Sequence, residues 1–301
     1  MGWVMASLGS AVLFAGVSVL DKRILAVHVP GLLGFYFLLG VIQVAMAMFV
    51  AVAGPWESGA SGEAVAAAMV SGTLWGGGLM LFFYGLRVLE VSRVAPIFHI
   101  SPVFVAIMAV FLLDERLLLV HWLAIFAVVS GAGLVMLGQD QSKTSRRTTL
   151  AFALVFLASI ITAAATVASK VALEEMNFWN VFAFRSLFLG VVFLIPAVRL
   201  HGLRQAKAVL ADRRGAGLIL LTEGVLAPIA VYAMLLALSL GPASLASTLM
   251  STRPVFVLII SALLSTRFWH VLDEPLTRDA LALKAVSAAM VVGGVSVLSL
   301  V

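Results

Sequence analysis

The sequence predicts an all-α membrane protein with ten transmembrane helices, arranged as two inverted five-helix repeats around a central cavity. Composition is the first observation: 63% of the residues are hydrophobic and 11% are charged, which is outside the range of soluble domains. The second is that Pro102-Val103-Phe104-Val105 recurs as Pro254-Val255-Phe256-Val257, each time inside a long apolar segment. Copies with an odd number of spans lie in opposite orientations across a bilayer.

The spanning segments follow from the apolar runs, because about 20 helical residues cross a hydrocarbon core. In the first half they lie near 3–20, 31–53, 64–86, 94–113 and 118–138, and in the second near 149–170, 178–199, 215–239, 242–264 and 280–300. We therefore expect a first repeat over 1–140, a linker over 141–148 and a second repeat over 149–301. The longest connections, near 200–214 and 265–279, leave no room for a soluble catalytic domain.

Several classes of chemistry have no support in this chain. It contains no cysteine, which excludes disulfides, thiolate metal sites and thiol nucleophiles. It has no H-E-x-x-H or G-x-S-x-G motif, and we expect no pair of carboxylates at membrane depth, so an enzyme is not expected. No cofactor or metal is expected either. No basic residue precedes the first apolar run, so we expect the first helix to be retained.

The placement of Lys and Arg predicts which connections share a side of the membrane. The odd-numbered connections hold fourteen of these residues, whereas the even-numbered ones hold Arg116 and Lys170. The positive-inside rule then places the odd connections in the cytoplasm and both termini outside. Binding to nucleic acid is not expected, since the basic residues are spread over short loops without interleaved aromatics.

Aligning the two halves shows where they agree and where they differ. A shift of 148 places Tyr84 on Tyr232 and Lys22 on Lys170, but Trp75 on Glu223. Around the prolines a shift of 152 places His99 on Ser251 and Ser101 on Arg253. We expect an asymmetric site in a symmetric frame, with most of the charge in the second half.

Three motifs carry a resemblance to a known family. Tyr84-Gly85-Leu86-Arg87, Ser101-Pro102-Val103-Phe104-Val105-Ala106 and Asp114-Glu115-Arg116-Leu117 resemble the EamA family of the drug/metabolite transporter superfamily. Gly241-Pro242-Ala243-Ser244 and the second Pro-Val-Phe-Val run are similar to its second copy. Asp273-Glu274-Pro275-Leu276 comes about seven residues late, which makes the 265–278 loop an insertion of unknown role.

The resemblance has consequences for fold and function. It implies ten helices, a cavity lined by segments one, three, four, six, eight and nine, and usually the export of small metabolites. It also implies that both termini lie in the cytoplasm, which is opposite to the charge count.

Two charged residues near mid-membrane are the main binding candidates. Glu223 lies nine residues into segment eight, roughly 12 Å along the helix. It could bind a proton or a cation as its environment alternates, or it could be a structural core carboxyl. Arg253 precedes Pro254, where an opened helix could let it bind a substrate anion. The alternatives are pairing with Glu223, despite an axial mismatch of roughly 9 Å, or reaching the interface.

Uncharged and aromatic residues complete the predicted substrate site. His99 could line the cavity and titrate near neutral pH, and Trp75, Tyr84 and Tyr232 could contact an organic cation or an amphipathic metabolite. A stripe of Ser159, Thr162, Thr166 and Lys170 suits a wetted wall, although such hydroxyls also bond back to their own helix. We expect Arg185, in segment seven, to extend its guanidinium to the headgroups or to be structural.

The expected function is secondary active transport of small organic metabolites, amino-acid-like or zwitterionic ones included, by alternating access and with export as the expected direction. A lipid-linked sugar or headgroup flippase of the same fold and a non-transport structural membrane protein are the alternatives. We expect the chain to lie in a bacterial inner membrane as a monomer or homodimer. Its expected partners are lipid, a small-molecule substrate and, as the candidate coupling ion, protons.

Overall fold

A computed structural model describes residues 2–89, 94, 97–134, 146–199 and 202–253, together with 255–257 and single positions near the C-terminus. These residues form helices joined by short connections, and no strand occurs among them. The helices are α1 Gly2–Arg23, α2 Leu32–Ala53, α3 Gly62–Val88, α5 Ser101–Leu112, α6 Leu119–Leu134, α7 Arg146–Glu175, α8 Phe178–Arg199, α9 Gly202–Ala211, α10 Arg213–Leu221, α11 Ala227–Leu240 and α12 Ala243–Met250. Two π-helical turns, η1 Ile24–His28 and η2 Thr222–Leu226, extend α1 and join α10 to α11.

Six helical stretches in the described part of the chain are long and apolar enough to cross a membrane: Gly2–His28, Leu32–Ala53, Gly62–Val88, Thr148–Glu175, Phe178–Val198 and Arg213–Leu240. Each of the first nine predicted segments coincides at least in part with a described helix. The tenth segment (280–300), the 265–278 loop, Pro254 and most of the 141–148 linker lie outside the described residues. The helix bounds differ in three places: α1 continues through η1, α7 extends to Glu175 beyond the predicted end at 170, and the connection near 200–214 contains α9.

At one end of the bundle, called the basic end here, three odd-numbered connections meet. His28 hydrogen-bonds to Asp212, Arg87 Nη2 donates to the Pro30 carbonyl at 2.9 Å, and Gly34 N donates to Gln205 Oε1 at 3.2 Å. The hydrogen bond from His28 and the backbone N–H groups of Gly215 and Arg214 hold the pKa of Asp212 below its usual range. Connections one, three and seven therefore lie on the same side, as the charge pattern predicts.

At the opposite end, called the acidic end here, the even-numbered connections meet. Asn177 Nδ2 donates to the Pro55 carbonyl at 2.8 Å and Asn180 Nδ2 to the Glu57 carbonyl at 2.6 Å. Glu115, in connection four, accepts hydrogen bonds from the backbone of Ala243 and from the hydroxyl of Ser244 at the start of α12. All of these contacts join the first half of the chain to the second.

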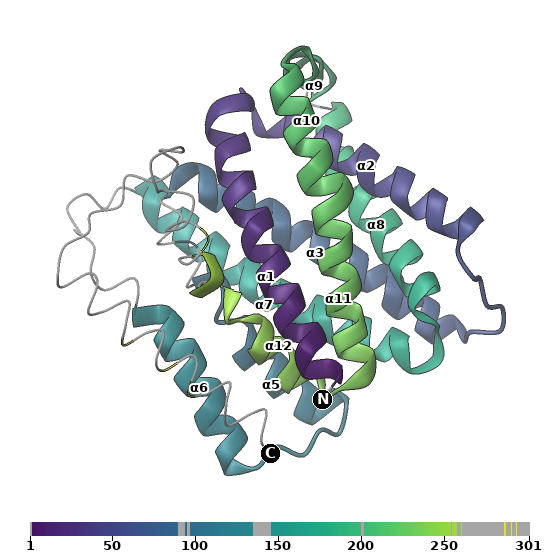
Figure 1. Cartoon of the computed structure of the whole chain (residues 1–301), viewed down its shortest axis with the longest axis vertical. Coiled ribbons are helices and arrows are strands. Elements are labelled where there is room, and N and C mark those ends of the chain that lie inside the picture. Colours follow the sequence, from purple (N-terminus) through teal and green to yellow (C-terminus); the bar gives the residue numbers. More distant parts are fainter. Residues whose placement is uncertain are drawn as a thin grey trace.

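α1 and α7 run in opposite directions through the bundle. α1 starts at the acidic end, where Trp3 packs against Gly241, and its extension η1 ends at the basic end. α7, its counterpart in the second half, ends at the acidic end next to Asn177. Helix contacts also occur in matched pairs: α1 packs on α11 as α7 packs on α3, and α1 packs on α12 as α7 packs on α5. Figure 1 shows α1 and α11 side by side along the bundle.

Glycines allow the closest helix contacts between the halves. A Cβ on Gly72 of α3 would overlap the backbone carbonyl of Arg185 in α8. A Cβ on Gly40 of α2 would lie 3.0 Å from the backbone oxygen of Gly190 in α8. Small residues stabilise helix contacts in membranes because they let backbones approach and increase dispersion contact. These glycines hold α8 against α2 and α3, which positions the face of α8 that carries Arg185.

The contact at Gly72 predicts a stability effect. Gly72→Ala is expected to destabilise the fold by about 1–3 kcal/mol, because the added methyl group meets backbone that cannot rotate away. Gly77→Ala is the control on the same helix, since a Cβ there meets no atom within 4 Å and alanine favours helix. Thermal unfolding of the purified protein in detergent measures both changes. Equal melting temperatures for the two variants would contradict this close packing.

The orientation of the protein in the membrane is given by which side the basic end and the acidic end face. It can be measured by cysteine labelling, because the chain has no cysteine of its own. Single cysteines are introduced at the exposed residues Lys207, at the basic end, and Ser58, at the acidic end. The positive-inside rule predicts that an impermeant maleimide labels Ser58→Cys in intact cells and Lys207→Cys only after permeabilisation. The reverse labelling would place the termini in the cytoplasm.

Candidate functional site

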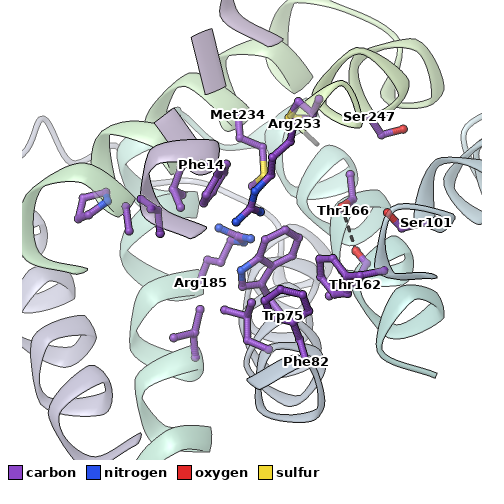
Figure 2. Close-up of a pocket in the computed structure, with 18 of the residues that line it drawn as sticks. Phe14, Trp75, Phe82, Ser101, Thr162, Thr166, Arg185, Met234, Ser247 and Arg253 are labelled. Atoms are coloured by element: carbon purple, nitrogen blue, oxygen red, sulfur yellow. Dashed lines mark hydrogen bonds between the residues drawn. The ribbon is translucent and has the colours of Figure 1, made fainter. Parts of the chain in front are cut away.

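A cavity lies at the centre of the bundle, where both halves contribute walls. It contains about 1180 Å³ of space not filled by protein atoms, part of it open to the outside, which is enough for a small organic molecule. Its described lining comes from α1, α2, α3, α5, α7, α8, η2, α11 and α12 and from the turn at His99. Figure 2 shows Arg185 and Arg253 extending toward each other inside it, beside Trp75 and Phe14.

Most of the site residues predicted from the sequence line this cavity. They are Glu223, Arg253, Trp75, His99 and Thr166. Tyr84 and Tyr232 are not among the described lining residues. Tyr84 is partly buried against the apolar core, and Tyr232, which is 43% exposed, packs edge-on against Phe178 with ring centroids 4.6 Å apart. The roles of all seven residues in substrate binding stay predictions.

Two helix breaks lie in the cavity wall at equivalent positions of the two halves. Ile100 N donates to the Ile97 carbonyl at 3.2 Å, and Thr252 N, 152 residues later, donates to the Leu249 carbonyl at 3.1 Å. Both turns are closed by bonds between residues three apart instead of four, just before Pro102 and Pro254, which lack an N–H to continue the helix. The breaks place His99 and Ser101 from one half and Ser251 and Arg253 from the other in the lining.

Glu223 is joined in the cavity by a second carboxylate, Asp21. Glu223 lies in the π-helical turn η2, and Asp21 lies near the end of α1. They are 6% and 4% exposed, and their carboxyl groups lie near enough for their charges to interact. Two buried carboxyl groups that interact titrate as a pair, and a proton on one of them removes the repulsion between like charges.

The expectation that no carboxylate pair lies at membrane depth is therefore wrong. The predicted first segment ends near residue 20, whereas the helix continues to His28. Asp21 therefore lies on a helix in the cavity wall and not in a connection. Helical spacing was the available signal, because Ser10, Phe14, Val17 and Asp21 follow one another at intervals of four, three and four.

Arg253 reaches across the cavity to the first half of the chain. Its Nη2 donates to the hydroxyl of Ser18 on α1, and its guanidinium lies 5.1 Å from the ring centroid of Phe14. It is near enough to Asp21 and Glu223 to interact with their charges, but its hydrogen bond goes to Ser18. Arg253 also lines the cavity, where its remaining donors could bind an anion.

Arg185 lines the cavity, so the expectation that its guanidinium reaches the headgroups is wrong, whereas its structural alternative stays a prediction. The residue is 2% exposed, and its guanidinium carbon lies 4.5 Å from the ring centroid of Trp75. Its Nε and Nη2 atoms have no hydrogen-bond partner among the described residues. The physical reason is the glycine contact between α3 and α8, which turns this face of α8 inward against Trp75.

The polar stripe of segment six divides into two parts. Thr162 and Thr166 line the cavity while their hydroxyls donate to carbonyls of their own helix, at 2.8 and 2.9 Å, which leaves oxygen lone pairs for a ligand. Lys170 is elsewhere: it belongs to α7 and not to a connection, and its Nζ donates to the Leu238 and Gly241 carbonyls at 2.9 and 3.2 Å. There it caps the C-terminus of α11.

Apolar helices long enough to span a membrane surround a cavity that holds charged side chains, and two helices are broken at that cavity. This arrangement is typical of an integral membrane transporter. The chain belongs to the EamA-like transporter family, whose model matches residues 1–137 and again 149–299. This result agrees with the resemblance found in the motifs.

Two individual proteins are similar to this chain. An uncharacterized transporter in the cobO 3′ region of Sinorhizobium sp is 34% identical over 94 residues, which cover 31% of this chain and 67% of that protein. A solved crystal structure superposes with a TM-score of 0.68 at 15% identity, covering 99% of this chain and 96% of the other. The second likeness concerns the fold alone.

Proposed function

We propose that this protein is a secondary active transporter that exports a small organic metabolite across a bacterial inner membrane by alternating access. The observation that carries this proposal is the convergence of both helix breaks on a cavity with two arginines and two carboxylates. The proposal treats 1–140 and 149–301 as inverted five-helix repeats joined by the 141–148 linker. The opposite directions of α1 and α7 and their matched contacts support it.

Alternating access needs contacts at each end that can open in turn. At the basic end, His28 and Asp212 join the two halves, and at the acidic end Glu115 joins the first half to the start of α12. All these contacts are polar and lie near the membrane surfaces, so water can replace them when they open. A rocking motion that opens one set while the other stays closed would expose the cavity to one side at a time.

The charged groups of the cavity suggest a division of roles. Arg253 orients a carboxylate or another anionic group of the substrate, and Glu223 binds a proton or an amine. An amino-acid-like zwitterion would use both charges. Asp21 gives Glu223 a partner that can keep a proton in the site while the cavity is closed. Substrate and proton binding would then be coupled, because each changes the charge that the other meets.

The coupling role is tested by proton-driven uptake in proteoliposomes, with a substrate identified by a thermal-shift screen of metabolites. Glu223→Gln is expected to lower proton-driven uptake at least tenfold and to remove its pH dependence, because the amide cannot bind or release a proton. Substrate exchange without a proton gradient is expected to continue. Glu63→Gln, at an exposed position in the first turn of α3, is the matched control. If Glu223→Gln shows the same proton-driven uptake and the same pH dependence as the wild type, the coupling role of Glu223 is refuted.

Removal of the Arg253 guanidinium tests its role in binding. Arg253→Ala is expected to weaken binding of an anionic substrate at least tenfold, equal to about 1.4 kcal/mol, while the protein still folds. Calorimetry measures the affinity, and size-exclusion chromatography with thermal unfolding checks the fold. Unchanged affinity in a folded Arg253→Ala protein would show that the residue is structural.

A further inference from the structure

Arg185 is a buried cation with two guanidinium nitrogens that have no hydrogen-bond partner among the described residues. The other cations of the described interior have partners: Lys170 donates to two carbonyls, and Arg253 donates to Ser18 beside two carboxylates. The Nε and Nη2 atoms of Arg185 have none. Two unpartnered N–H groups on a buried guanidinium are unfavourable inside a membrane protein, and an anion that accepts hydrogen bonds from both would satisfy them.

The two unpartnered nitrogens identify the kind of anion. Nε and Nη2 lie on the same edge of the planar guanidinium, and their N–H bonds are parallel. That edge matches a carboxylate, which accepts two parallel hydrogen bonds from it. Trp75 covers one face of the guanidinium at 4.5 Å and thereby holds its plane in one orientation. Because Arg185 lines the cavity, we expect a planar oxyanion to approach this guanidinium from there.

Charge balance and wall chemistry define the rest of the ligand. The described charged groups that line the cavity are Arg185, Arg253, Asp21 and Glu223. When the two carboxyl groups share one proton and His99 is uncharged, one positive charge is in excess, and an organic monoanion neutralises it. Aromatic and apolar side chains make up much of the remaining wall, among them Phe14, Trp75, Phe82 and Met234.

We propose that Arg185 binds the carboxylate of an organic anion with an aromatic or apolar body, and that it sets the selectivity of the cavity for anions. This inference rests on the proposed transport function, because it names the substrate class of the same cavity. It assigns the bidentate contact to Arg185. Arg253, already bonded to Ser18, contributes a second positive charge.

The test compares probes of one shape and different charge. Phenylacetate, the neutral phenylacetamide and the cationic 2-phenylethylamine are titrated by calorimetry into the purified full-length protein in lipid nanodiscs. Phenylacetate is expected to bind at least tenfold more tightly than the other two. Arg185→Gln is expected to abolish this preference, so that phenylacetate and phenylacetamide bind with similar affinity. Arg204→Gln, at an exposed position of α9, is the control and is expected to leave the preference unchanged.

A second variant separates binding from folding. Arg185→Lys keeps the charge and the long stem but cannot form the paired hydrogen bonds, so it is expected to fold and to bind phenylacetate several-fold more weakly than the wild type. Both Arg185 variants are checked by size-exclusion chromatography and thermal unfolding. If Arg185→Gln does not fold, the result for Arg185→Lys decides.

Two results would overturn the inference: no preference of the wild type for phenylacetate over phenylacetamide, or a wild-type preference in folded Arg185 variants. Flux distinguishes this failure from failure of the proposed function. Proton-driven transport of a screened metabolite that is unaffected by Arg185→Gln would leave the transporter proposal standing and refute this one. If the protein transports none of the screened metabolites but binds phenylacetate through Arg185, the transporter proposal is refuted and the binding role of Arg185 stands.

Discussion

The cost of placing ionised side chains inside a membrane is the constraint on which the rest of this structure depends. Asp21, Arg185, Glu223 and Arg253 all lie within the bundle and line one cavity. An isolated charge at such a depth is strongly unfavourable, but here each carboxylate faces another carboxyl group and arginine, and each arginine contacts an aromatic ring. The helices are arranged so that these groups face one another and not the lipid.

The same arrangement requires close backbone contacts and interrupted helices. Gly72 and Gly40 let α8 approach α3 and α2, which turns Arg185 toward Trp75. The breaks before Pro102 and Pro254 open two helices at the cavity, where their freed backbone is shielded from lipid by the surrounding helices. Polar contacts join the halves in the interior, where Arg253 bonds to Ser18 and Ser71 bonds to Ser169, and also at the two ends of the bundle. Charged groups at the centre and contacts between the halves at both ends are the arrangement on which the proposed alternating access depends.

The sequence predicted much of the candidate site because depth in an apolar segment is readable from residue spacing. Glu223 and Arg253 are charged residues far from any predicted helix end. Trp75 aligns with Glu223 in the other copy, and His99 is a titratable residue in an apolar segment. Tyr84 was selected by type, but the direction of an aromatic side chain depends on which neighbours its helix has. The ends of helices are uncertain by several residues when they are predicted from sequence. The first helix continues past the predicted end near residue 20, and this extension places Asp21 in the cavity wall and not in a connection.

By itself, the sequence determined the membrane-protein class, the approximate placement of the nine predicted segments that fall on described helices, and the grouping of their described connections at two ends of the bundle. These properties depend on hydrophobicity, length and charge along the chain, which are local quantities. Only the tertiary structure decided that Arg185 turns inward, that Asp21 meets Glu223 and that Lys170 caps α11. These are contacts between segments far apart in the chain, and they depend on helix rotation and close approach, which no single apolar segment encodes.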